Sequence, residues 1–235
     1  ARPRLGVLCG LRSEVHCMGR WVAHSAVSIE VSGATNNGAK RGAAALIDGG
    51  AKVLLSWGLC GGLSKELRSG DFVQPERLAL PGAGNTEYID LDELTLPRAR
   101  HGVLAGSEAI LTAPSQKAAV AEQTGALAVD MESIPLALAG INAGLPVFVV
   151  RAVADNVELQ LPDLAIGALD DRGRIRPWRA VRALMADPTQ IGAAIRAGRA
   201  ARRGLRSLRS VADDVFGSLL ADEPDFKTAC GQRRR

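Results

Sequence analysis

The 235-residue sequence has few aromatic side chains: one tyrosine, four phenylalanines and three tryptophans. Proteins that bind single-stranded nucleic acid stack bases on such rings, so a nucleic-acid partner is not expected. The four cysteines show neither C-x-x-C spacing nor a paired framework, which argues against a zinc site and a secreted disulfide scaffold. No stretch approaches the roughly 18 apolar residues of a membrane span. We therefore expect a cytoplasmic, enzyme-like protein without a bound metal.

The order of apolar and Ala-rich segments predicts the fold class. Apolar runs typical of strands covered on both faces lie at residues 4–11, 25–33, 51–58, 70–80 and 144–155. Ala-rich stretches with helical spacing, each ending near glycine, lie at residues 36–50, 114–125 and 132–144. Strands that alternate with helices in this way favour one α/β domain with a largely parallel sheet.

The formal net charge of +4 is concentrated near the C-terminus, where residues 188–220 are predicted to form a helix. At about 100° per residue, arginines fall on one arc and aliphatic residues on the opposite one. The arginines are Arg196, Arg199, Arg202, Arg203, Arg206 and Arg209, and the aliphatic residues are Leu205, Leu208, Val211, Val215 and Leu219. The helix is weakened by Gly198 and Gly204. Its arginine face is either simply solvated or meets anionic lipid headgroups, and residues 223–235 are expected to be a disordered tail.

The segment SWGLCGGL, at residues 56–63, fits two templates. G-x-C-x-G is the pattern of a nucleophile elbow, a turn that would present Cys60 as a catalytic thiol. It also fits a glycine-rich loop that lets a ligand approach the backbone, through Gly58, Gly61 and Gly62. A catalytic thiol needs a histidine base, and the only downstream histidine, His101, lies in a loop-like stretch without an evident carboxylate partner. We therefore favour the glycine-rich loop, with Cys60 as a small, half-buried side chain.

A resemblance to a known family rests on a combination of motifs in a characteristic order. The motifs are GVLCGLRSEV, which places Glu14 after the first strand, SWGLCGGLSKELRSGDFVQP (56–75), AVDMES (128–133) and VRAVAD (150–155). Over about residues 4–160 the sequence resembles the nucleoside phosphorylase and nucleosidase superfamily. The resemblance implies a single domain over residues 1–222 with a three-layer, phosphorylase/hydrolase-like α/β fold, whose central mixed, largely parallel sheet is flanked by helices. The segments SWGLCGGL and AVDMES and the arginine-rich C-terminal part resemble those of the hopanoid-associated phosphorylase branch.

The resemblance also implies roles for individual residues in cleaving a purine–ribose bond. Asp155 matches the acid that protonates N7 of the base, and Glu132 matches the ribose-binding glutamate, with Met131 beside it along the sugar. Glu14 matches the glutamate that activates water in the hydrolytic members. Against that, Arg12 and Arg41 lie near loops where phosphorylases bind phosphate. Water and inorganic phosphate therefore both remain open as the nucleophile, and no cofactor is implied.

The sequence departs from the family pattern at Ala154, where serine commonly precedes the aspartate, and at Leu59, which is often serine. These changes put the usual methylthioadenosine substrate in doubt. The apolar segment 156–170 fits either a hydrophobic 5′ substituent or packing against a second subunit. We expect a homo-oligomer that releases adenine from adenosylhopane at the inner face of the membrane. One alternative is a methylthioadenosine/S-adenosylhomocysteine nucleosidase, and an alternative from another class is a nucleoside-binding protein without catalysis.

Overall fold

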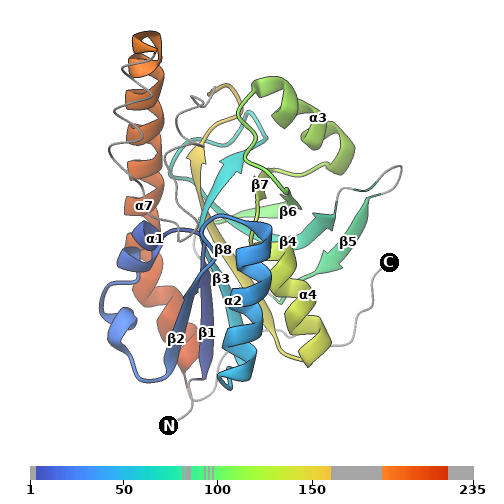
Figure 1. The fold of residues 1–235 in the computed structure, drawn as a ribbon, viewed down its shortest axis with the longest axis vertical. Coiled ribbons are helices and arrows are strands. Elements are labelled where there is room, and N and C mark those ends of the chain that lie inside the picture. The colour runs from blue at the N-terminus through green and yellow to red at the C-terminus, as the bar shows by residue number, and fades with distance from the viewer. Residues whose placement is uncertain are drawn as a thin grey trace.

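The computed structural model describes residues 4–80, 86–92, 98–159 and 187–221, together with residues 82, 94 and 96. Within these residues the strands are β1 (Leu5–Cys9), β2 (Val27–Val31), β3 (Val53–Gly62), β4 (Phe72–Leu80), β5 (Glu87–Asp90), β6 (Arg100–Gly106), β7 (Ala128–Asp130) and β8 (Val147–Asp155). They form one sheet in the order β2-β1-β3-β7-β6-β4-β5, and β8 pairs with both β3 and β4 (Figure 1). The expected tail at 223–235 and residues 160–170 of the apolar segment lie outside the described residues.

Most strand pairs in the sheet are parallel. The parallel pairs are β1–β2, β1–β3, β3–β8, β4–β6 and β6–β7, and the antiparallel pairs are β3–β7, β4–β5 and β4–β8. The prediction of a mixed, largely parallel sheet is therefore confirmed. Because β8 bonds to both β3 and β4, the pairing closes a ring through β3, β7, β6, β4 and β8.

Helices cover both faces of the sheet, which confirms the three-layer α/β arrangement. One face carries α2 (Asn36–Asp48) and α4 (Ser133–Ala143), and the other carries α1 (Arg12–Cys17) and α7 (Ile191–Leu220). The helix α3 (Pro114–Thr124) lies beside β6 and β7 near one end of the strands (Figure 1). Two short 3-10 helices complete the described elements, Gly19–Ala23 and Pro188–Gln190.

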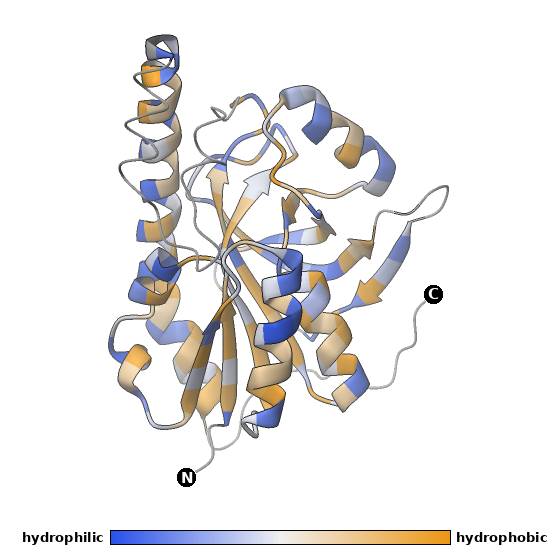
Figure 2. Cartoon of the chain, in the orientation of Figure 1, coloured by the Kyte–Doolittle hydropathy of each residue, from blue (hydrophilic) through white to orange (hydrophobic). Residues whose placement is uncertain are grey.

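Alternating side chains of the buried strands build the two hydrophobic layers, because successive residues of a strand point to opposite faces. In β3, Leu54 packs in the layer under α2 and α4, whereas Val53 and Leu55 pack in the layer under α7. The strands β1 and β8 divide their side chains in the same way, and their residues are largely hydrophobic (Figure 2). The expectation of strands covered on both faces is thus confirmed for β1, β3 and β8, whereas β2 is only half-buried along its length.

The helix α7 packs its apolar side on the sheet and exposes its arginines. Phe216 is fully buried, with its ring edge-on to Trp57 at 5.3 Å and stacked on Trp21 at 5.8 Å. All six predicted arginines of the arc are exposed. Gly204 permits a close approach that we did not expect: a Cβ there would lie 2.7 Å from Leu59 Cδ2 and 3.0 Å from the Val153 carbonyl oxygen.

The described helices include none that is both long and apolar enough to span a membrane. The N-terminal half of α7 extends past the ends of the strands, and hydrophilic and hydrophobic residues alternate along it (Figures 1 and 2). Its exposed apolar side chains include Ile191 and Ile195.

Candidate active site

Glu14 is held in a buried position in the first turn of α1, the helix that follows β1. Its Oε2 accepts a hydrogen bond from the Leu11 N–H at 2.8 Å, and its Oε1 accepts one from the Leu59 N–H at 2.9 Å. The indole N–H of Trp57 donates to the Glu14 carbonyl at 3.2 Å. Burial raises the pKa of Glu14, although the Arg151 guanidinium and the backbone donors oppose the shift. A buried carboxylate with a raised pKa is suited to accept a proton near neutral pH.

Glu132 immediately precedes α4, without a side-chain capping bond, and its carboxylate lies near that of Glu14 beside Gly10. The Ser32 hydroxyl donates to Glu132 Oε1 at 3.2 Å. A Cβ at Gly10 would lie 3.0 Å from Glu132 Oε1 and 3.3 Å from Glu14 Oε2, so the two carboxylates flank this glycine at the end of β1. Burial raises the pKa of Glu132, against the opposing effect of Arg151. Met131 precedes Glu132 and is half-buried.

Arg151 is a site residue that sequence analysis missed. It lies on β8 and is fully buried, with its Nη2 at the centre of a polar network. The Nη2 atom forms an ion pair with Asp130, donates to Ser56 Oγ at 2.6 Å and Ser133 Oγ at 3.2 Å, and lies 3.6 Å from Glu132 Oε2. Burial alone would lower the pKa of Arg151, but the surrounding carboxylates raise it. Within the described residues, its Nε and Nη1 atoms have no hydrogen-bond partner.

The prediction that SWGLCGGL forms a glycine-rich loop is wrong, because β3 continues to Gly62. Parallel pairing with β8 extends to Gly61, and antiparallel pairing with β7 adds further bonds at the same end. Gly58 pairs with Arg151, and a Cβ at Gly58 would lie 2.4 Å from Arg151 Nη1 and 2.8 Å from Glu14 Oε1. Glycine inside a strand often marks such a close approach. Gly58 therefore leaves room for the side chains of Arg151 and Glu14. That Gly58, Gly61 and Gly62 also lie against a nucleoside stays a prediction.

The geometry around Cys60 excludes the nucleophile elbow. Cys60 lies within β3 and is buried in the hydrophobic layer under α2 and α4. Burial raises the pKa of its thiol well above the ordinary value, so the thiolate is disfavoured. His101, expected in a loop, is an exposed residue of β6. The expectation that Cys60 fills space is consistent with this packing, although it is more deeply buried than expected.

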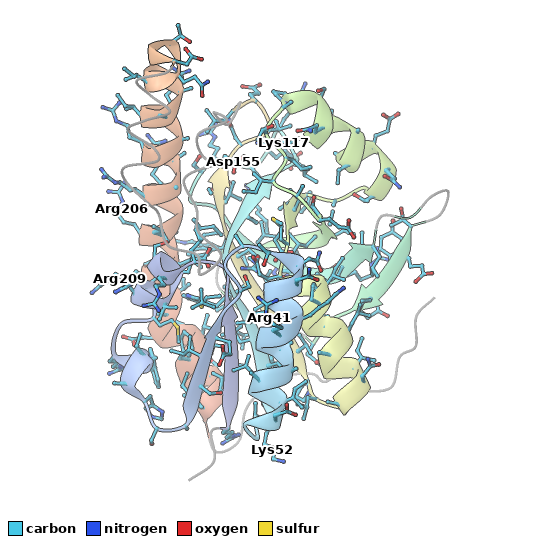
Figure 3. The ribbon with its side chains drawn as sticks, in the orientation of Figure 1. Arg41, Lys52, Lys117, Asp155, Arg206 and Arg209 are labelled. Atoms are coloured by element: carbon cyan, nitrogen blue, oxygen red, sulfur yellow. The ribbon has the colours of Figure 1, made fainter. Side chains whose placement is uncertain are left out.

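Asp155 ends β8 and forms a buried ion pair with Lys117 of α3 (Figure 3). The Lys117 Nζ atom also donates to the Asn156 carbonyl at 2.8 Å and to the Leu159 carbonyl at 3.3 Å. Burial raises the pKa of Asp155, while Lys117 opposes the shift. Lys117 was not singled out in the sequence, because its stretch of α3 looks like an ordinary surface helix.

These residues make two separate polar groups along β8. Glu14, Glu132 and Arg151 form one, and Asp155 with Lys117 forms the other. Asp155 is four positions beyond Arg151, which corresponds to about 13 Å in a regular strand. The register of pairing with β3 shifts between Cys60 and Gly61, and such a bulge shortens the distance.

Neither candidate phosphate ligand joins these groups. Arg12 and Arg41 are both exposed, Arg41 on the outer part of α2 (Figure 3), and their role stays a prediction. The part of the chain that the structure describes contains no group of three or more His, Cys, Asp or Glu side chains that could hold a metal ion.

Comparisons with known proteins agree with the motifs. Residues 85–166 match the family model described as the phosphorylase superfamily. No curated protein matches the sequence.

Among solved structures, 5′-methylthioadenosine/S-adenosylhomocysteine nucleosidase of Helicobacter pylori is similar with a TM-score of 0.62 at 14% identity, over 91% of this chain and 99% of that one. Futalosine hydrolase of the same organism has a TM-score of 0.62 at 15% identity, over 91% and 98%. The methylthioadenosine/S-adenosylhomocysteine nucleosidase of Streptococcus pneumoniae has a TM-score of 0.57 at 18% identity, over 88% and 99%. At these identities, the likeness establishes a shared fold over nearly the whole of each chain.

Proposed function

We propose that this chain belongs to the phosphorylase superfamily and cleaves the N-glycosidic bond of a purine nucleoside. The observation that carries the proposal is the spacing of buried acidic groups along β8. Glu14 and Glu132 gather around Arg151, and Asp155 lies about 13 Å or less further along the strand. That span suits a nucleoside, with its ribose at the first group and its base at Asp155.

The charges of the two groups fit the transition state of this reaction. As the bond between ribose and purine breaks, positive charge develops on the sugar and negative charge on the base. The carboxylates of Glu14 and Glu132 stabilise the sugar cation, and Glu132 accepts hydrogen bonds from the ribose hydroxyls. Asp155, whose pKa is raised by burial, donates a proton to N7 of the departing base.

The charge balance around Arg151 favours water as the nucleophile. Three buried carboxyl groups, Asp130, Glu132 and Glu14, face one guanidinium. Such a group repels a phosphate anion, whereas it tolerates a neutral water molecule. Glu14 has the position and the raised pKa of a base that deprotonates this water. We therefore propose hydrolysis rather than phosphorolysis.

Base release measured by liquid chromatography, with and without inorganic phosphate, tests this function directly. Hydrolysis predicts the same rate in both conditions and a sugar product with a free anomeric hydroxyl by mass analysis. Asp155→Asn should lose about 10²- to 10⁴-fold in kcat/KM, while the control Glu122→Gln, an exposed residue of α3, should match the parent. An Asp155→Asn protein as fast as the parent would refute the role of Asp155. Binding without base release from any nucleoside would favour a nucleoside-binding protein instead.

For the substrate, we propose a lipid-linked adenine nucleoside, adenosylhopane. The support is the resemblance of SWGLCGGL and AVDMES to the hopanoid-associated branch, together with the position of α7. At Gly204 this helix packs directly on Leu59, the residue after Gly58, while its arginine arc faces outward. An arginine face of this kind suits anionic lipid headgroups, and it would place a membrane surface on the side of the sheet that α7 covers.

Two comparisons test the lipid-linked substrate. Turnover of adenosylhopane should exceed that of methylthioadenosine and S-adenosylhomocysteine; comparable turnover would favour the housekeeping nucleosidase. In sedimentation with phosphatidylglycerol vesicles, Arg202→Glu/Arg206→Glu should bind about 30-fold more weakly, because each arginine near the surface contributes roughly 1 kcal/mol. The matched control is Lys40→Glu/Lys52→Glu. Lys40 lies on α2 and Lys52 in the loop between α2 and β3, and both lysines are exposed. Equal binding by both variants would refute the membrane contact.

A further inference from the structure

Lys117 has surroundings that are unusual for a lysine. Its side chain is 1% exposed, whereas lysines are almost never fully buried unless they are paired. Its ammonium group has three N–H donors, and three acceptors surround it: Asp155 Oδ2, the Asn156 carbonyl and the Leu159 carbonyl. The ammonium is therefore fully satisfied and fixed in direction.

This arrangement leaves one oxygen of Asp155 available. Lys117 binds Oδ2, and within the described part of the chain Oδ1 accepts no hydrogen bond. Gly61 lies beside the carboxylate, and a Cβ there would be 3.7 Å from each of its oxygens. No side chain of β3 therefore lies against the carboxylate at this residue.

Lys117 also supplies a hydrogen bond to the Asp155 carboxylate that the neighbouring residue of β8 cannot make. The preceding residue is Ala154, which has no hydroxyl to orient the carboxylate. The hydrogen bond to Asp155 comes instead from α3, 38 positions earlier in the chain. Among the described residues, Lys117 is the charged group that faces Asp155, and the other titratable neighbour is the buried thiol of Cys60 on β3.

We propose that Lys117 is a positioning residue for Asp155, holding Oδ2 so that Oδ1 faces the nucleobase and stabilising the carboxylate that remains after proton transfer. This inference rests on the proposed function. In the step, the proton of Asp155 moves to N7, the electron pair of the bond between C1′ and N9 moves to the base, and the oxygen of a water molecule, which gives a proton to Glu14, bonds to C1′. Asp155 is left as an anion beside the Lys117 cation and regains a proton from solvent after the base has left.

The pH profile separates this role from a purely structural one. Lys117 lowers the pKa of Asp155, so Lys117→Met should raise it and move the alkaline limb of the kcat/KM profile to higher pH. At the optimum, Lys117→Met should lose about 10- to 100-fold, mainly in kcat, because the carboxylate is no longer held. Lys117→Arg should recover part of the loss, and Lys65→Met, at an exposed lysine, serves as the control. An unshifted alkaline limb in Lys117→Met would overturn the proposal.

Two further measurements keep the test decisive. In the Asp155→Asn background, Lys117→Met should change kcat/KM by less than about twofold, since the group it acts through is absent; a full additional loss would indicate a structural role. Titration of the Asp155 carboxyl by ¹³C NMR does not depend on turnover. If the parent releases no base from any nucleoside, the proposed function fails, and the titration still decides whether Lys117 controls Asp155. Where Lys117→Met does not fold, the same titration is made on Lys117→Gln, which keeps an N–H donor without the charge, and an unmoved pKa of Asp155 contradicts the inference.

Discussion

Gly58→Ala offers a sharp test of the site, because it adds one methyl group between two charged residues. The new Cβ would lie 2.4 Å from Arg151 Nη1 and 2.8 Å from Glu14 Oε1. Ordinary van der Waals contact begins at 3.4 Å, so the guanidinium must retreat by about 1 Å and the carboxylate by somewhat less. Neither group can move independently, since Arg151 is bonded to Ser56 and Ser133 and Glu14 to two backbone N–H groups.

The size of the effect follows from this displacement. A misplacement of about 1 Å in a catalytic group costs roughly 10²-fold in rate, so kcat/KM should fall about 100-fold. Overpacking of a buried site also costs about 1–3 kcal/mol of stability. The loss of activity should thus be much larger than the loss of folded protein at 25 °C.

The assay combines base release with urea denaturation of the same samples. Gly198→Ala is the matched control, because a Cβ at Gly198 meets nothing within 4 Å; it should keep full activity and gain about 0.5–1 kcal/mol from its helical position. Gly61→Ala, where the nearest contact is 3.3 Å from Val129 Cγ1, should lie between the two. If Gly58→Ala keeps activity within threefold of the parent, the packing of Gly58 against Arg151 and Glu14 has no bearing on catalysis.

Three further outcomes are expected. Activity should follow a bell-shaped pH profile, because Glu14 and Glu132 must be deprotonated and Asp155 protonated. Burial raises the pKa of each, so both limbs should lie above the ordinary carboxyl range, and a flat profile would refute these assignments. Cys60→Ala should keep activity within about threefold in the base-release assay, because burial keeps the group a thiol; near-complete loss would revive a catalytic cysteine. Phe216→Ala, which removes the ring between Trp57 and Trp21, should lower the free energy of unfolding by about 3–5 kcal/mol in urea, and a change below 1 kcal/mol would show that α7 is anchored elsewhere.

Sequence patterns identified the strands and helices that bury long apolar faces. The apolar run at 51–58 became β3, and the stretch at 36–50 became α2 with a shift of two residues at its C-terminal end. The missed strands are those whose residues carry little local signal. Three residues make up β7, and β6 begins with Arg100 and His101. Such strands are specified by the neighbours with which they pair, and a local pattern does not contain that information.

The site was partly predictable for a similar reason. Glu14 and Glu132 follow strands and Asp155 ends one, each in a recognisable motif, and the structure buries all three. Arg151 had a signal that was overlooked: a charge within the apolar run VFVVRAVAD must be paired if the strand is buried. Lys117 had none, because its burial depends on where α3 docks on the rest of the chain.

The network around Arg151 also bears on how such a chain changes over generations. A buried guanidinium whose Nε and Nη1 have no hydrogen-bond partner in the part of the chain that the structure describes, and which faces several carboxylates, stabilises a core poorly. Replacing the whole group by well-packed apolar residues is often neutral or stabilising by about 1–4 kcal/mol. In a lineage that no longer used this site, substitutions that replace the cluster would therefore be tolerated and could raise the free energy of unfolding. The chain retains Arg151 together with Asp130, Glu132 and Glu14. Selection for the chemistry of these groups accounts for their retention.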